Sequence, residues 1–292
     1  MIRPKFCMIV GICGAGKTTF CNKMATEHGM IHISSDAIRR ELRGDDHEYH
    51  PEDNDQVFKI MHRRVFDALD KGSNVLYDAT NVTRKDRTDI LNKIPNYVCK
   101  ECYIVWAPIS TCIQQDAGRE YPVGTAVVHK MLKKFQAPFY DEGFEKIVVV
   151  RPDKFDQMRY TEQCLKDMDI PHDNPHHSLG VYEHCIAAFN YLHFNNFGDQ
   201  DVRCAAYWHD VGKPYVKAFI DGHGNSCECA HFYQHQSYGA WMSYGLAGGD
   251  VRVAWLISTH MDPFWNSKYY LHLPSFLRRD IDLLHEADKN SH

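Results

Sequence analysis

Apolar residues in the first 150 positions form short runs of β-branched and aromatic side chains, separated by longer stretches with helical spacing. Five short runs are expected to be strands, at residues 6–10, 30–35, 74–80, 97–108 and 145–150. The stretches at 16–28 and 56–72 have the spacing of helices. Strands that alternate with helices are typical of a parallel sheet with crossover helices. We therefore expect an α/β domain over residues 1–150.

The second half of the chain loses this alternation. Residues 151–170 carry prolines and mixed charges without a sustained period, as expected of a linker with room for one helix. Four later stretches show helical spacing, at residues 180–195, 201–213, 232–245 and 250–260. The pattern predicts an all-α domain over residues 171–292.

Composition narrows the classes of protein. A chain of 292 residues is long enough for two cores, and the net charge of -5 argues against a broadly basic nucleic-acid binder. No apolar run approaches the roughly 18 residues of a membrane span, so no membrane partner is expected. The sequence starts with an apolar strand and no export signal, and its 11 cysteines are scattered. These features indicate reduced thiols and a cytoplasmic protein.

The segment GICGAGKT, residues 11–18, fits the pattern of a phosphate-binding loop between a strand and a helix. Its backbone N–H groups can face phosphates, Lys17 can reach the β and γ oxygens, and Thr18 can bind Mg²⁺. ATP and Mg²⁺ are therefore the expected cofactors. The predicted ATP-binding residues are Gly11, Gly14, Ala15, Gly16, Lys17, Thr18, Thr19 and Asp78.

Residues for the phosphoryl acceptor are expected after the second strand. Asp36 and Arg39 are three apart, so they share a helix face, where a carboxylate can take the proton of an attacking hydroxyl and Arg39 can hold an anionic group. The alternative is that Asp36 caps the helix with help from Ser34 or Ser35. Asp78 ends the third strand and can contact Mg²⁺ through water or fix the acceptor-side arginine.

Arg119 lies in the polar stretch 112–124, where an arginine can neutralise charge on a transferring phosphoryl group. A solvated surface arginine is an equal alternative. Together with the loop, the D-x-x-R of Asp36 and Arg39, and DATN at Asp78, this arginine makes residues 1–150 resemble the P-loop kinase domain of the polynucleotide 5′-kinases. The resemblance implies that Asp36 is the general base and that Arg39 grips the acceptor phosphate. Gln114 or Gln115 stands where that family often has a second lid arginine.

Histidines and aspartates fall on or at the ends of separate helical stretches in the second half. The candidate metal ligands are His184, His209, Asp210, His235, His260 and Asp288. Taken singly, each histidine is more easily an ordinary helix residue. As a set, imidazoles and carboxylates suit Mn²⁺, Fe²⁺, Co²⁺, Ni²⁺ or Zn²⁺, and six ligands are enough for two ions bridged by Asp210.

The order H…HD…H…H…D resembles the HD-superfamily phosphohydrolases over residues 170–292. That resemblance implies a main site of His184, His209, Asp210 and Asp288, with His235 and His260 completing a second metal. Lys213, after HDVG, also matches and could hold a substrate phosphate. Nothing in the sequence determines where the side chains of four further histidines point, and these are more easily surface residues: His176, His177, His223 and His231.

The two halves together resemble bifunctional end-healing enzymes. The resemblance implies ATP-dependent phosphorylation of 5′-hydroxyl ends of RNA or DNA, and removal of a 2′,3′-cyclic or terminal 2′ or 3′ phosphate. A nucleic-acid ligase would then use the ends. Two alternatives remain: a small-metabolite kinase fused to a nucleotide phosphohydrolase, or a kinase with a non-catalytic RNA-binding module. Aromatic residues could stack on bases, but core packing is expected for Trp208, Trp241 and Trp255, whereas Trp265 stays open.

Overall fold

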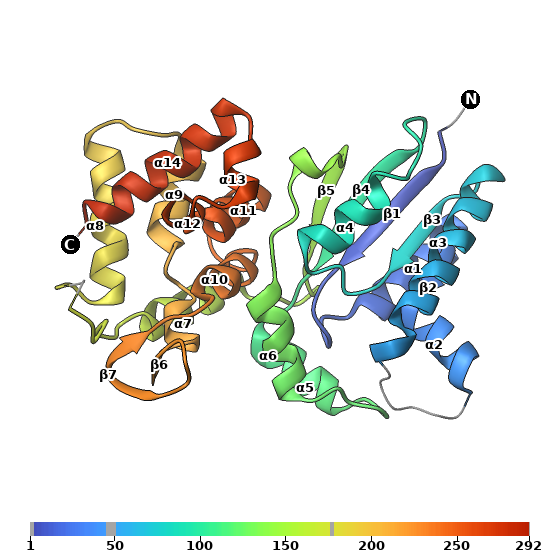
Figure 1. The fold of residues 1–292 in the computed structure, drawn as a ribbon, viewed down its shortest axis with the longest axis horizontal. Helices are drawn as coiled ribbons and strands as arrows, with labels where there is room; N and C mark the ends of the chain where they lie inside the picture. Colours follow the sequence, from blue (N-terminus) through green and yellow to red (C-terminus); the bar gives the residue numbers. More distant parts are fainter. Residues whose placement is uncertain (1–2, 45–50, 176–177, 292) are drawn as a thin grey trace. The chain divides into compact units, whose positions relative to one another are not determined.

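The computed structural model describes residues 3–44, 51–175 and 178–291, which form two compact units (Figure 1). The first unit comprises Met1–Met131 and Pro138–Pro152. The second comprises Leu132–Ala137 and Asp153–His292. Each unit has its own core, and each is described separately below.

The first unit is built on a five-stranded parallel sheet with the order β2-β3-β1-β4-β5. The strands are β1 (Lys5–Val10), β2 (Ile31–Ser34), β3 (Val75–Asp78), β4 (Cys99–Val105) and β5 (Lys146–Val150). The α-helices are α1 (Lys17–His28), α2 (Ser35–Arg43), α3 (Asn54–Asp70), α4 (Arg84–Leu91), α5 (Ile109–Ala117) and the part of α6 (Thr125–Lys134) up to Met131. Short 3₁₀ helices lie at η1 (Pro51–Asp53) and η2 (Tyr140–Glu142). The predicted parallel α/β fold is confirmed.

Burial explains why these runs form strands. All residues of β1 after Lys5 are buried, and the four residues of β3 beside it are also buried. Strands buried on both faces read as continuous apolar runs, which is how these two appear in the sequence. Because all five strands are parallel, β1, β2 and β3 end at the same edge of the sheet. That edge holds the phosphate loop, the start of α2, and Asp78.

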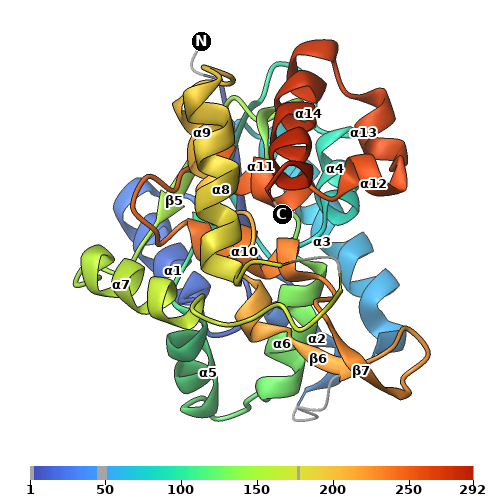
Figure 2. The same ribbon diagram turned by 90° about the vertical axis from the view of Figure 1, so that its left-hand side faces the viewer.

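Helices dominate the second unit (Figure 2). They are α7 (Gln157–Asp167), α8 (Val181–Phe194), α9 (Gln200–Trp208), α10 (His235–Ser243), α11 (Val251–Thr259), α12 (Asp262–Trp265), α13 (Lys268–His272) and α14 (Ser275–Lys289), with the 3₁₀ helix η3 (Lys213–Tyr215). Helices α8, α9 and α14 pack against one another, and α11 packs on α9 and α10. Within the described ranges, no helix is both long enough and apolar enough to cross a membrane.

The all-α expectation is wrong at one place, because β6 (Ala218–Ile220) and β7 (Ser226–His231) form an antiparallel hairpin. Its turn is made by Asp221, whose Oδ1 accepts the backbone N–H groups of His223 at 2.9 Å and Asn225 at 2.8 Å. Gly224, with φ of +87°, supplies the left-handed residue of the turn. The three residues of β6 are too few to show alternation, and the six of β7 contain no large apolar side chain, so the turn at residues 221–225 was the readable signal.

The tryptophans of the second unit divide as expected between core and surface. Trp241 and Trp255 are fully buried, and Trp208 is 3% exposed. Trp265, at the end of α12, is 58% exposed. Core packing is therefore confirmed for Trp208, Trp241 and Trp255, whereas Trp265 is exposed to solvent.

Candidate functional sites

The phosphate loop joins β1 to α1 and has the curled backbone of an anion cradle. Gly14 has φ of +76° and Gly16 has φ of +93°, which are left-handed values that favour glycine. A Cβ on Gly14 would lie 2.0 Å from the carbonyl oxygen of Cys112, so this position also requires glycine for close approach. Lys17 Nζ donates to the Ile12 carbonyl at 2.9 Å within the loop. The loop backbone therefore already has the conformation that phosphate binding requires.

Asp36 does not cap α2, which was the alternative to a catalytic role. The N-cap of α2 is Ser34, whose Oγ accepts the Ala37 N–H at 3.4 Å. The Asp36 carboxylate lies in the first turn with its side chain 66% exposed. Arg39 donates to Asp36 Oδ1 at 3.0 Å and to Asn54 Oδ1 at 3.0 Å, so the pair shares one face. This geometry leaves an oriented, accessible carboxylate next to a cation.

Asp78 lies at the end of β3, where its carboxylate Oδ2 is 2.8 Å from His32 Nε2 of β2. Mg²⁺ or an arginine was expected at Asp78, and His32 was not among the predicted site residues. Only the β2–β3 pairing, which sets His32 opposite Leu76 and Ser34 opposite Asp78, brings the ring to the carboxylate. The following segment is anchored to the loop, because the Gly11 N–H donates to the Thr80 carbonyl at 3.1 Å.

Arg119 follows α5 in a turn that is organised by Asp116. The buried Asp116 carboxylate accepts the N–H groups of Gly124 at 2.8 Å and Val123 at 3.3 Å. Arg119 Nη1 is 3.5 Å from Asp116 Oδ1, and its side chain is 40% exposed. The turn thus presents a partly open guanidinium on an anchored backbone, while Gln114 and Gln115 are exposed.

Six side chains of the second unit converge on one buried point, although they come from separate elements. We call them the histidine–aspartate cluster: His184, His209, Asp210, His235, His260 and Asp288. Two groups within it have ligand atoms that all lie within 4.8 Å of one another. These groups are His184 with His209 and Asp288, and Asp210 with His235 and His260. All six predicted ligands are therefore brought together.

Backbone carbonyls orient each histidine of the cluster. The Nδ1 atoms of His209, His235 and His260 donate to the carbonyl three residues earlier, at 2.8, 2.9 and 2.8 Å. His184 Nδ1 donates to the Ser291 carbonyl at 2.8 Å. Because a carbonyl only accepts, each Nδ1 carries the hydrogen and each Nε2 faces the cluster. Metal-binding histidines are held in this way by an outer partner.

The Nε2 atoms that face one another are in close contact. His235 Nε2 is 3.1 Å from His260 Nε2, and His184 Nε2 is 3.1 Å from His209 Nε2. Burial lowers the pKa of His235 to about 4 and that of His260 to about 3, so neither ring is protonated at neutral pH. Neighbouring nitrogen ligands of one ion at about 2.1 Å are themselves about 3.0–3.4 Å apart. The residues thus fit a shared divalent ion.

Carboxylates complete the charge of the cluster. Asp210 Oδ1 is 3.2 Å from His235 Nε2, and Asp288 Oδ1 is 2.9 Å from His184 Nε2. Burial alone would raise the pKa of Asp210, but the adjacent His209 charge and Lys213 hold it well below its ordinary value. Both carboxylates therefore remain negative, and Asp210 lies between the two groups of ligands.

Lys213 and His172 extend the cluster on one side. Lys213 is buried, and its Nζ lies 2.5 Å from Asp210 Oδ2 and donates to His172 Nε2 at 2.9 Å. His172 was missed because it lies in the irregular segment before α8, where no period or motif marks it. His172 Nδ1 donates to the Leu179 carbonyl at 2.7 Å, which turns Nε2 toward the cluster.

A glycine allows the elements of the cluster to approach. A Cβ on Gly212 would lie 2.1 Å from the His235 carbonyl oxygen, so only glycine fits after the His-Asp turn.

Of the four other histidines, His223 is exposed, and His231 stacks on Tyr233 with ring centroids 5.3 Å apart. His176 and His177 lie outside the described residues.

Comparison with known proteins shows a similarity within the first half of the chain. Residues 6–138 match the family model described as an AAA domain. With its parallel sheet and its glycine-rich loop between β1 and α1, the first unit has a P-loop α/β fold. The family model ends before the histidine–aspartate cluster begins.

Three solved structures illustrate the similarity. Two are entitled Structure of Pnkp1/Rnl/Hen1 complex and Structure of the Pnkp1/Rnl/Hen1 RNA repair complex, each 22% identical, with TM-scores of 0.36 and 0.41. They cover 39% and 46% of this chain, which spans 39% and 44% of theirs. A gluconokinase from Sinorhizobium meliloti 1021 is 17% identical with a TM-score of 0.38, covering 52% of this chain and 86% of its own. No curated protein matches the chain.

Proposed function

We propose that the chain is a bifunctional enzyme that repairs broken nucleic-acid ends, most of all RNA ends. The first unit phosphorylates a 5′-hydroxyl with ATP, and residues 171–292 of the second form a metal-dependent phosphohydrolase of the HD type. The observation that carries the second activity is the set of four histidines, each held at Nδ1 by a carbonyl and turned onto two carboxylates. An arrangement built only for packing would not bring the unprotonated Nε2 atoms of His235 and His260 within 3.1 Å of each other.

In the kinase reaction, the first unit's residues position both substrates. The loop amides and Lys17 bind the phosphates of ATP, and Thr18 with Asp78 would hold Mg²⁺, which offsets the charge on the phosphates. Asp36 accepts the proton of the attacking 5′-hydroxyl, and Arg39 binds the neighbouring phosphate of the strand. Arg119 approaches the transferring phosphoryl group from the turn after α5. The exposure of Asp36 supports this assignment because a polymeric acceptor must reach it.

In the hydrolysis reaction, the histidine–aspartate cluster would hold one or two ions of Mn²⁺, Fe²⁺, Co²⁺, Ni²⁺ or Zn²⁺. Such ions lower the pKa of a bound water and offset charge on phosphate oxygens. His184, His209 and Asp288 would hold one ion, His235 and His260 would hold the other, and Asp210 would contribute a carboxylate oxygen to each. Lys213 keeps Asp210 ionised and oriented through its 2.5 Å contact.

A kinase and a phosphatase on one chain would cancel on a shared position, but they cooperate on opposite ends of a break. The substrate of the hydrolase is therefore proposed to be a 2′,3′-cyclic phosphate or a terminal 2′ or 3′ phosphate. A nucleic-acid ligase would use the two repaired ends. The exposed Trp265 indole supports a polynucleotide substrate because aromatic faces stack on unpaired bases.

The decisive experiment uses a short RNA with a 5′-hydroxyl and a 2′,3′-cyclic phosphate, incubated with ATP, Mg²⁺ and each transition ion in turn. Wild type is compared with Asp36→Ala and Asp210→Ala, and both ends of the product are resolved. We expect Asp36→Ala to lose only 5′ phosphorylation and Asp210→Ala to lose only 3′ hydrolysis. Each variant serves as the folding control for the other activity.

Other outcomes distinguish the alternatives. ATP consumption with a nucleoside or small alcohol, and with neither RNA end altered, would replace this proposal by a metabolite kinase. Purified protein that holds no transition metal, hydrolyses no phosphate after metal addition and still binds RNA would identify the second unit as a binding module.

A further inference from the structure

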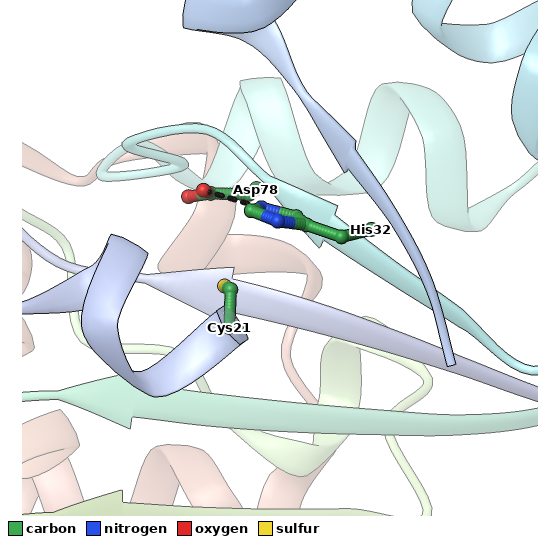
Figure 3. A group of neighbouring side chains, drawn as sticks. All are labelled: Cys21, His32 and Asp78. Atoms are coloured by element: carbon green, nitrogen blue, oxygen red, sulfur yellow. Dashed lines mark hydrogen bonds and ion pairs between the residues drawn. The ribbon is translucent and has the colours of Figure 1, made fainter. Parts of the chain in front are cut away.

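A second group of potential metal ligands lies in the first unit, outside the histidine–aspartate cluster. The ligand atoms of Cys21, His32 and Asp78 all lie within 4.8 Å of one another (Figure 3). They come from α1, β2 and β3, so the sheet and its first helix bring together residues far apart in the sequence. Figure 3 shows the Cys21 side chain rising from its helix toward the hydrogen-bonded His32–Asp78 pair.

The surroundings of the group are those of a shielded site with one open side. Cys21 is fully buried in an apolar cluster that includes Ile9 and Leu76. The side chains of Asp78 and His32 are 7% and 19% exposed. A thiol in such a core usually faces apolar groups on all sides, whereas this one also faces an imidazole and a carboxylate. That combination is the first indication of a ligand.

We propose that Cys21, His32 and Asp78 bind one thiophilic divalent ion of the zinc class. Thiolate, imidazole and carboxylate together suit Zn²⁺ and disfavour Mg²⁺, which prefers oxygen ligands alone. Neighbouring ligands of a tetrahedral ion of this class are about 3.3–3.6 Å apart, so separations of up to 4.8 Å have to close by at most about 1.2–1.5 Å when the ion binds. Three protein ligands leave one position of a tetrahedral ion for water.

The position of this site gives it a consequence for phosphoryl transfer, which rests on the proposed kinase function. Cys21 lies one helical turn after Thr18, the expected Mg²⁺ ligand on the same helix. Asp78 is common to both sets of ligands. An ion held by Cys21 and His32 draws Asp78 away from Mg²⁺, so a zinc-class ion inhibits the kinase in competition with Mg²⁺.

Binding is tested directly on the full chain by titration with Cd²⁺ or Co²⁺, which give ultraviolet or visible thiolate-to-metal absorption. We expect wild type to show this absorption and Cys21→Ser to lose it together with one bound ion per chain. His32→Gln should weaken binding roughly 10–100-fold or more, because a ligand matters at least as much as an outer partner does. Cys7→Ser is the matched control, since Cys7 lies in the same apolar cluster.

Two results overturn the site: absorption and stoichiometry unchanged in both Cys21→Ser and His32→Gln, or equal loss in Cys7→Ser. The histidine variant keeps the test decisive if the core substitution unfolds the chain. In a second experiment, 5′ phosphorylation is measured at fixed Mg²⁺ and increasing Zn²⁺. Half inhibition of His32→Gln should need at least tenfold more Zn²⁺ than half inhibition of wild type. Metal binding without inhibition overturns the competition. A chain without kinase activity overturns the proposed function, while absorption still decides the site.

Discussion

The phosphate loop of the first unit is one contiguous run of backbone, whereas the histidine–aspartate cluster of the second gathers side chains from across more than a hundred positions. His184 and Asp288 are 104 residues apart in the chain and meet at 2.9 Å. The loop needs only the local conformation of its glycines. The cluster needs five helical segments to pack correctly before any ligand is in place.

The two sites also differ in how their polar groups are satisfied. In the first unit, Asp36 is mostly exposed and Lys17 has a backbone partner, so the site is stable without a ligand. In the second, buried lone pairs of His235 and His260 face each other at 3.1 Å. Buried polar atoms without partners are costly. We therefore expect a bound ion to contribute to the stability of the second unit, whereas the first unit should be equally stable when its ion dissociates.

Metal removal should separate the two regions most strongly. After chelation and dialysis into Mg²⁺ alone, we expect hydrolysis to be abolished and kinase activity to remain. Loss of an ion present at 100 times its Kd should lower the free energy of unfolding of the second unit by about 2.7 kcal/mol. Metal analysis and calorimetry measure both effects.

His260→Ala should reproduce this loss, whereas His223→Ala, an exposed loop histidine, should leave metal content unchanged. Equal metal content and equal activity in all three proteins would show that the cluster is an ordinary buried core.

Arg119→Ala tests whether the first site extends to the turn after α5. Because an arginine on a transferring phosphoryl group contributes greatly to the rate, we expect kcat for phosphorylation to fall roughly 10³-fold. Arg63→Ala, on the exposed surface of α3, is the control. If both variants phosphorylate equally well, Arg119 is only a solvated surface residue.

Gly14→Ala isolates the contribution of backbone shape. Gly14 and Gly72 share φ of +76°, but a Cβ meets the Cys112 carbonyl at 2.0 Å only in the first case. Gly72→Ala is therefore the control, and both Gly14→Ala and Gly72→Ala should lose about 1–2 kcal/mol of stability because alanine is strained in the left-handed conformation. Gly14→Ala should lose more and should also weaken ATP binding, as measured by denaturation and calorimetry. Equal ATP affinity in the two variants would contradict the cradle geometry.

The smallest expected effect concerns His62 of α3, whose Nε2 lies 3.1 Å from the Tyr77 hydroxyl. Burial, assisted by the charge of Lys93, lowers the pKa of His62 below its ordinary value of 6.5. The unfolded chain then binds more protons just below pH 6.5, so the free energy of unfolding falls as pH decreases through that window.

His62→Gln should flatten this slope for the unfolding of the first unit without altering either activity. Urea denaturation at several pH values measures the change. An unchanged slope would show that His62 titrates normally in the folded state.

Several features of the fold were predictable from local patterns. The buried runs of β1 and β3, the helix after the phosphate loop and the helical second half all leave periodic or compositional signals. The β6–β7 hairpin was missed because the three residues of β6 are too few for a period and β7 lacks a run of large apolar side chains. The sequence left open whether Asp36 caps α2 with help from Ser34 or Ser35, and the backbone identified Ser34 as the N-cap.

The sequence by itself determined which residue types could do chemistry: a glycine loop with Lys17, a carboxylate near Arg39, and six possible ligands in H…HD…H…H…D order. Tertiary structure alone decided the partners. It joined His32 to Asp78, brought Cys21 beside them, turned each Nε2 of the cluster inward, and added His172. The physical reason is range, because spacing along a chain specifies which residues share a helix face or strand end. Strand pairing and helix packing over a hundred residues specify which atoms meet.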